Sequence, residues 1–238
     1  MKKSIALFLV SLMCSVLSAQ LSPGEVSYTL SLGIIKAGKA SLKTEKTSYN
    51  GRDAYKVSLI AATNSVADRI YRIRDTLTTV VTPQIEPLSF VKHSHEGDDV
   101  VAETAVFAKT ATGYHGKLVK RYKEGDTRET DTICPHPIYD MVSLVLYARK
   151  LDTDGMKTGD RLHFAMADGG LVKNEEMIFL GTDYLKLSGV LYDCLVFSIE
   201  QSDSKEELLR IYLSADEARV PIAMDISLPF GKAKVRMN

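Results

Sequence analysis

The sequence contains no tryptophan, and it has only three cysteines among 238 residues. The absence of tryptophan removes the commonest aromatic platform for binding sugars. None of the patterns GxSxG, HExxH, GxGxxG or the P-loop occurs either. These are the local signatures of esterases, zinc peptidases and nucleotide-binding proteins. A hydrolase with a spatially assembled site stays open as an alternative, because the members of a catalytic triad need not be close in sequence.

The chain also has no apolar run long enough to cross a bilayer comfortably. Two lysines follow the first methionine, a short apolar segment comes next, and Ser18-Ala19 supplies small residues. This order is typical of a secretory signal peptide, so residues 1–19 are predicted to be removed by a cut after Ala19. The remaining residues, 20–238, are expected to form a single exported β-rich domain, periplasmic or secreted, with no transmembrane segment.

A lipoprotein signal is not expected. Such a signal needs a small residue before the modified cysteine, but Met13 precedes Cys14. Removal of residues 1–19 therefore leaves two cysteines, Cys134 and Cys194. In an oxidising compartment they either form a disulfide or remain separate buried thiols, and the sequence leaves both alternatives open.

Net charge is also small. The chain has 30 basic and 30 acidic residues, and loss of two lysines with the signal peptide leaves 28 against 30, about −2. The charges are dispersed, with no basic block. Nucleic acid is therefore not an expected partner, and nothing in the charge pattern attracts the chain to an anionic membrane.

What the sequence has in abundance is alternation of apolar and polar residues. It is clearest in residues 208–238, where the apolar positions are Leu209, Ile211, Leu213, Ile222, Met224, Ile226, Leu228, Ala233, Val235 and Met237. This period of two predicts strands with one buried face. Turn residues at 214–217 and 229–231 divide the segment into two hairpins. We expect a three-stranded meander at the edge of a sheet.

The same pattern recurs along most of the chain. Three strands are expected at 25–34, 40–49 and 54–62, and Asn50-Gly51 between the last two is a strong signal for a type I′ hairpin turn. Residues 64–73 favour a short helical turn with Ser65 as N-cap, followed by a strand to Val81. Further strands are expected at 88–95, 100–108, 114–122, after 126, and at 161–167, 171–180, 184–187 and 194–201. The predicted fold is mainly β: a large curved antiparallel sheet, half-barrel or sandwich-like.

One helix interrupts this pattern, at residues 137–151. Pro137 suits its first turn, and the apolar residues Ile138, Met141, Val142, Val145 and Leu146 have helical spacing, widened by Leu144 and Tyr147. Arg149 and Lys150 suit its C-terminal end. So apolar a helix is expected to be buried in the concave side of the sheet.

Candidate metal and catalytic residues are few. His93 and His95 alternate on one predicted strand face, and His136 or Glu96 would be needed to complete a metal site. A solvated strand face explains the two histidines equally well. Acidic pairs such as Asp98-Asp99 lie in predicted turns, where acidic residues are common. The sequence therefore assigns no catalytic, cofactor-binding or metal-binding residue, and no cofactor.

Four segments carry a resemblance to a known family: YTLSLGIIKAGKASL, KTGDRLHFAMADGG, YDCLVF and RIYLSADEARVPIAMDISLPFGKAKV. Together they resemble the exported bacterial family called domain of unknown function 3108. The resemblance implies a secreted envelope protein of Gram-negative bacteria, Bacteroidetes among them, with no established activity. Members often have tryptophan in the strand that here contains Tyr212, and its absence makes glycan binding less expected for this chain.

Two classes of function fit these observations besides the hydrolase. The first is a non-enzymatic envelope protein that binds a lipid or other amphiphile in the concavity of the sheet. An apolar cavity of a few hundred cubic ångströms would favour it. The alternative is a structural or adaptor module for an envelope protein or glycan partner, which an exposed apolar patch or an unpaired edge strand would favour. A helix that simply fills the concavity would leave no room for a ligand.

Overall fold

The computed structural model describes residues 21–228 and 231–238. The predicted signal peptide, Gln20, and Pro229 and Phe230 of the turn predicted at 229–231 lie outside the described residues. The described part of the chain forms one α-helix, α1 (Met141–Lys150), one short 3₁₀-helix, η1 (Ala67–Arg69), and fifteen strands. The strands are β1 (Gly24–Leu32), β2 (Ile35–Tyr49), β3 (Arg52–Thr63), β4 (Arg74–Val81), β5 (Pro87–Glu96), β6 (Asp99–Thr110), β7 (Gly113–Tyr122), β8 (Thr127–Cys134), β9 (Ile138–Tyr139), β10 (Arg161–Asp168), β11 (Leu171–Leu187), β12 (Val190–Gln201), β13 (Glu207–Ser214), β14 (Pro221–Leu228) and β15 (Gly231–Met237).

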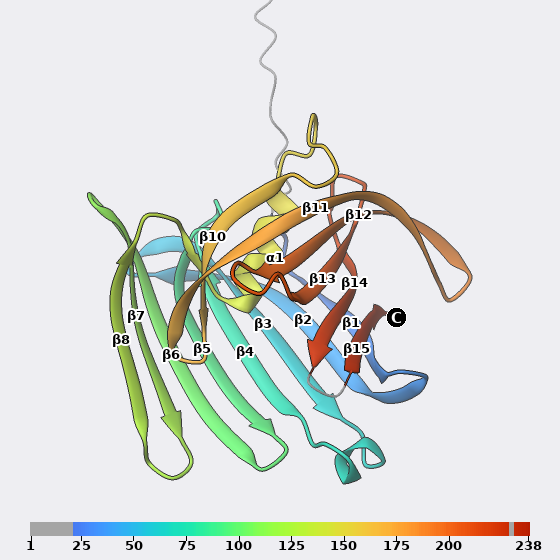
Figure 1. Ribbon diagram of the computed structural model, residues 1–238, viewed down its shortest axis with the longest axis horizontal. Helices are drawn as coiled ribbons and strands as arrows, with labels where there is room; N and C mark the ends of the chain where they lie inside the picture. Colours follow the sequence, from blue (N-terminus) through green and yellow to red (C-terminus); the bar gives the residue numbers. More distant parts are fainter. Residues whose placement is uncertain (1–20, 229–230) are drawn as a thin grey trace, which may run out of the picture.

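All fifteen strands belong to one sheet, which curls into a barrel-like shape around α1 (Figure 1). Its order is β8-β7-β6-β5-β4-β3-β2-β1-β15-β14-β13-β12-β11-β10-β9. Every neighbouring pair is antiparallel except β9 and β10. The predicted large curved antiparallel sheet with one buried helix is confirmed. The Asn50-Gly51 hairpin is confirmed too, with φ of 51° and 77°.

The position predicted for the C-terminal meander is wrong. The segment does form strands β13 to β15 with the expected apolar face, on which Met224 pairs with Val235. However, β15 also pairs with β1, where Val235 lies opposite Leu30, so the meander lies in the middle of the sheet. Alternation reveals which face of a strand is buried, but it does not reveal which strand lies beside it.

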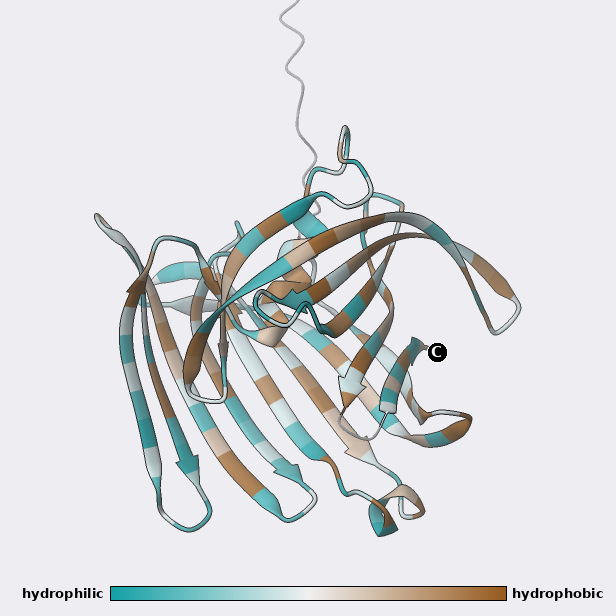
Figure 2. Cartoon of the chain, in the orientation of Figure 1, coloured by the Kyte–Doolittle hydropathy of each residue, from teal (hydrophilic) through white to brown (hydrophobic). Residues whose placement is uncertain are grey.

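The core lies between the inner face of the sheet and α1. Apolar residues concentrate on the helix and on the strands around it (Figure 2). On β12, Leu195, Phe197 and Ile199 share the inner face and are at most 6% exposed. The outer face of the same strand is also buried, because long side chains cover it. Val196 lies opposite Tyr212 on β13, and the guanidinium group of Arg236 lies over the Tyr212 ring.

The helix is shorter at its start than the predicted span of 137–151. It begins at Met141, with Asp140 as N-cap, whereas Ile138 and Tyr139 form β9 and pair in parallel with β10. Asp140 accepts hydrogen bonds from the backbone N–H groups of Val142 and Ser143, at 2.9 and 3.0 Å. Pro137 is therefore not in the first helical turn. A capping carboxylate and a non-local strand pairing together override the apolar spacing.

Asp140 also fixes the helix to the wall of the barrel. Its side chain is fully buried and accepts a hydrogen bond of 2.8 Å from the Thr79 hydroxyl on β4. Burial raises the pKa of Asp140, opposed by its hydrogen bonds from Ser143, Thr79 and Val142. The same residue thus starts α1 and holds it against the sheet.

At the other short helical segment, the predicted cap is off by one residue. Asn64, not Ser65, accepts hydrogen bonds from the N–H groups of Val66 and Ala67, both at 3.0 Å. Its amide also donates to the Lys36 carbonyl at the start of β2, which joins this segment to the neighbouring hairpin. The following strand starts at Arg74.

The two ends of the sheet meet through a turn rather than through a strand pair. The turn between β10 and β11 lies against β6, β7 and β8. The Thr130 hydroxyl donates to the Gly170 carbonyl at 2.7 Å, and the Gly170 N–H donates to the Glu103 carboxylate at 3.2 Å. We call these contacts the seam. The seam makes the barrel nearly closed without completing its hydrogen-bond ladder.

A candidate ligand cavity beside the helix

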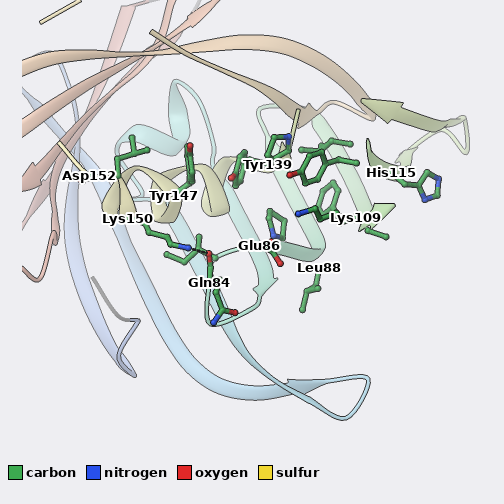
Figure 3. Close-up of a pocket in the computed structure, with 17 residues that line it drawn as sticks. Gln84, Glu86, Leu88, Lys109, His115, Tyr139, Tyr147, Lys150 and Asp152 are labelled. Carbon is green, nitrogen blue, oxygen red and sulfur yellow. Dashed lines mark hydrogen bonds between the residues drawn. The ribbon is translucent and has the colours of Figure 1, made fainter. Parts of the chain in front are cut away.

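A cavity of about 380 Å³ lies at the C-terminal end of α1 (Figure 3). Its walls come from the helix, the loop between β4 and β5, the adjacent ends of β6 and β7, and β9. Most of the lining is apolar or aromatic, including Leu88, Phe107, Tyr114, Ile138, Tyr139 and Tyr147. The helix therefore does not fill the whole concavity of the sheet.

The helix contributes one face to this cavity. Tyr147, Lys150 and Leu151 line it, at spacings of three and four residues that place them on the same side of a helix. Leu144 and Leu146 do not line the cavity; they are at most 1% exposed and belong to the core. The Asp140 cap, two turns earlier, thus sets where Tyr147 stands.

Aromatic rings pack closely at the centre of the site. The ring of Tyr139 stacks on that of Tyr147 with centroids 4.7 Å apart, and it meets Phe164 of β10 edge-on at 6.4 Å. Burial, with a smaller contribution from Tyr147 and Tyr114, raises the pKa of Tyr139, and burial also raises that of Tyr147. Both hydroxyls are therefore neutral at every physiological pH and available as hydrogen-bond donors.

Charged side chains stand at the rim. The Lys150 ammonium donates to the Gln84 carbonyl at 2.7 Å, which joins the helix to the loop between β4 and β5. The Lys109 ammonium lies 5.8 Å from the centre of the Tyr114 ring, a cation–π contact. Glu86 and Asp152 also line the cavity. The rim thus carries two cations and two anions.

The other part of the barrel interior is polar. A smaller cavity of about 250 Å³ near the seam is lined by Lys92, Glu96, Glu103 and Lys120, among others. Lys92 pairs with Glu96 and Lys120 with Glu103, each at 3.5 Å. Burial alone would lower the pKa of Lys92, but these carboxylates raise it. Each lysine is thus paired with a carboxylate, and Asp99 and Asp168 in the same lining leave this cavity with more acidic than basic groups.

The structure keeps His93 and His95 together on one face of β5, where both line the same cavity, but it does not complete a metal site around them. His93 is exposed on the outer face of β5, whereas Glu96 lies on the opposite, inner face and pairs with Lys92. His136 lies near His163, with ring centroids 6.5 Å apart. In the part of the chain that the structure describes, no group of three potential ligands could hold a metal ion.

The two cysteines are separate thiols. Cys134 is half-buried at the end of β8, and Cys194 is fully buried in β12. Burial, with the nearby carboxylates of Asp193 and Asp183, raises the pKa of the Cys194 thiol to about 11. A thiol in this state is a poor nucleophile.

The tyrosines of the cavity were not predicted as a site. The sequence contained only part of the information needed to find this cavity. Tyr147 belonged to the predicted apolar stripe of the helix, and Tyr139 fell inside the span predicted to be helical. Tyr114 comes from a strand more than twenty residues earlier. Their convergence depends on the parallel pairing of β9 with β10, which has no local sequence signature.

Together, the fold and the cavity define a class: an all-β protein whose single barrel-like sheet encloses a helix and leaves an aromatic cavity beside it. The chain belongs to the family described as protein of unknown function DUF3108, whose model matches residues 27–238. No curated protein matches the sequence.

A solved structure shares the fold. A β-barrel-like protein of the DUF1849 family from Brucella abortus matches with a TM-score of 0.60 at 12% identity, over 93% of this chain and 98% of that one. A DUF1089 family protein from Pseudomonas aeruginosa matches at a TM-score of 0.31 and 13% identity, over 84% and 89% of the two chains. Across the described residues, no helix combines the length and apolar character needed to cross a membrane.

Proposed function

We propose that this protein is a non-enzymatic, exported envelope protein that binds a small amphiphile in the aromatic cavity beside α1. The cavity carries the proposal. Its volume of about 380 Å³ lies at the small end of the range of roughly 300–1,000 Å³ for ligand sites. A single acyl chain or a compact aromatic molecule suits this volume, whereas a whole phospholipid does not.

The lining supports an amphiphile rather than a purely polar ligand. Aromatic and aliphatic side chains form the walls, and the charges stand at the rim, next to Gln84 and Asp152 (Figure 3). An apolar body would therefore lie against the tyrosines while its polar end meets water. Export from the cell rests on the N-terminal sequence pattern, residues 1–19, and on the family resemblance.

The test is mass spectrometry of an organic extract of the protein purified from its native envelope. We expect a co-purifying amphiphile at close to one molecule per chain. Leu88→Asp should abolish this signal, because Leu88 is half-buried, lines the cavity and stands outside the main core. Leu191→Asp, on the exposed tip of the β11–β12 hairpin, is the matched control and should leave the signal intact.

Both variants must show the thermal unfolding of a folded protein. An extract with no stoichiometric ligand, together with no binding of added acyl chains, would overturn the proposal. Loss of the ligand in the Leu191→Asp control alone would place the binding site elsewhere.

An adaptor role is the second candidate, and one observation favours it. The hairpin of β11 and β12 projects from the barrel (Figure 1), and its exposed apolar residues are Tyr184, Val190 and Leu191, which are 52–67% exposed. Isolated two-stranded hairpins are marginally stable in water. Crosslinking from a photoreactive group at Tyr184 in native envelopes tests this candidate, and a single crosslinked protein is the expected outcome.

A further inference from the structure

The Tyr139 hydroxyl opens onto the cavity without a protein partner. The residue is only 6% exposed and lines the cavity, and its side chain makes no hydrogen bond to another residue that the structure describes. Among the described residues, no fully buried side-chain polar atom lacks a partner, so this hydroxyl is open to the cavity rather than sealed in the core. A tyrosine with a buried ring usually places its hydroxyl against a hydrogen-bond partner. A group aimed into a cavity without a partner points to a ligand.

The surroundings of Tyr139 hold it ready to donate. Its ring is fixed between Tyr147 and Phe164, at centroid distances of 4.7 and 6.4 Å. Two further tyrosines, Tyr114 and Tyr147, line the same cavity and lie close enough to affect its titration. Figure 3 shows Tyr139 between the helix, which carries Tyr147 and Lys150, and Lys109 from β6. The cavity thus offers fixed, neutral O–H donors at its centre.

Charge alone does not select the head group of a ligand here. Lys109 and Lys150 are opposed at the rim by Glu86 and Asp152. The tyrosine hydroxyls therefore select the head group, because they bind a ligand whose polar end accepts hydrogen bonds more tightly than one whose polar end does not. A head group without an acceptor would leave them unsatisfied.

We propose that the amphiphile has an oxygen-bearing acyl head, a carboxylate or an ester, which accepts a hydrogen bond from the Tyr139 hydroxyl inside the cavity. This inference rests on the proposed function, because it names the ligand class for the same cavity. It assigns Tyr139 as the residue that determines specificity for the head group. Tyr114 and Tyr147 complete the donor set.

Three probes with the same twelve-carbon chain test this assignment in the purified full-length chain. Laurate and glyceryl monolaurate carry acceptor oxygens, whereas dodecyltrimethylammonium carries none. Calorimetric titration, below the critical micelle concentration of each probe, should show that the first two bind at least about tenfold more tightly than the third.

Tyr139→Phe keeps the ring and removes only the hydroxyl. We expect it to weaken the binding of laurate and monolaurate by about threefold to tenfold and to leave dodecyltrimethylammonium unchanged. Tyr184→Phe, on the exposed hairpin tip, is the control and should change neither. Should Tyr139→Phe fold poorly, Tyr147→Phe tests the same donor set from the helix.

The outcomes separate the two proposals. If all three probes bind with similar affinity and the phenylalanine variants change nothing, the assignment of Tyr139 is wrong while amphiphile binding stands. If none of the probes binds the wild-type chain, amphiphile binding itself fails in this cavity. Tighter binding of dodecyltrimethylammonium than of laurate would show that Glu86 and Asp152, rather than the tyrosines, select the head group.

Discussion

At the scale of single residues, Asp140 links the fold to the site. It caps α1, receives the Thr79 hydroxyl of β4 and thereby fixes the helix that carries Tyr147. The residue type and spacing were readable in the sequence, since Asp140 and Ser143 have the spacing of a capping box. The sequence could not reveal that this cap is buried, because burial comes from strands some sixty residues away.

Substitution of Asp140 should therefore destabilise the whole barrel. We expect Asp140→Ala to lower the free energy of unfolding by about 1–2 kcal/mol, the usual cost of a lost N-cap. Asp140→Asn keeps one capping oxygen and should cost less. Urea denaturation at neutral pH measures both, and equal stability of the alanine variant and the wild type would contradict the role assigned to the cap.

The pH dependence of the same residue follows from the direction of its pKa shift. Because burial raises the pKa of Asp140, the folded protein binds this proton more tightly than the unfolded chain does. The stability from this effect is fully present below the ordinary aspartate pKa and is lost as pH rises through the raised value. Relative to Asp140→Asn, the wild type should thus lose stability as pH rises above about 4.

At the scale of elements, strand periodicity was the reliable part of the sequence. Nearly every predicted strand exists, because one buried face per strand imposes a period of two. The boundary of α1 was wrong, since Ile138 continues the helical spacing of the apolar residues although it lies in β9. The cavity was unpredictable for a related reason: its tyrosines come from three elements whose contact depends on non-local pairing.

The seam offers a prediction about the turn between β10 and β11. Gly170 has a φ of 71°, and a Cβ there would lie 2.8 Å from the Cβ of Lys120. Gly189, in the turn between β11 and β12, has a similar φ of 87° but open space around it. Both alanine variants incur backbone strain of roughly 1–2 kcal/mol, and only Gly170→Ala also crowds the seam.

We therefore expect Gly170→Ala to be less stable than Gly189→Ala by about 1–3 kcal/mol, the usual range for overpacking. Urea denaturation gives the difference. Hydrogen exchange should locate the added opening in β8 and β10, next to the seam. Equal destabilisation by the two variants would mean that the turn does not hold the barrel closed.

At the scale of the whole molecule, the sequence predicted the shape of the sheet but not its order. The C-terminal meander was expected at an edge, because each of its strands could pair with any other amphipathic strand. Its place beside β1 follows from side-chain matching over long distances, such as the hydrogen bond of 3.0 Å from Tyr28 to the Pro221 carbonyl. Such matches are visible only once the chain is folded.

The pairing of β1 with β15 makes the chain nearly circular. Met237 lies opposite Tyr28, and the Asn238 N–H donates to the Ser27 carbonyl at 3.1 Å. Contacts between such distant parts of the chain carry a high loop-closure entropy, which slows folding. A ribosome or translocon that has not yet released β15 therefore leaves the sheet split into two halves.

In a circular permutant, β15 and β1 become consecutive strands, so their pairing no longer has to wait for the end of the chain. A linker of about ten glycine and serine residues spans the gap from Asn238 to Leu21, with new termini opened between Asn50 and Gly51. We expect this permutant to fold, to keep the cavity and to refold faster than the wild type in stopped-flow experiments. Failure to fold would show that the Asn50-Gly51 hairpin nucleates the barrel. Folding would then depend on the order in which the strands are synthesised as well as on which strands pair in the native sheet.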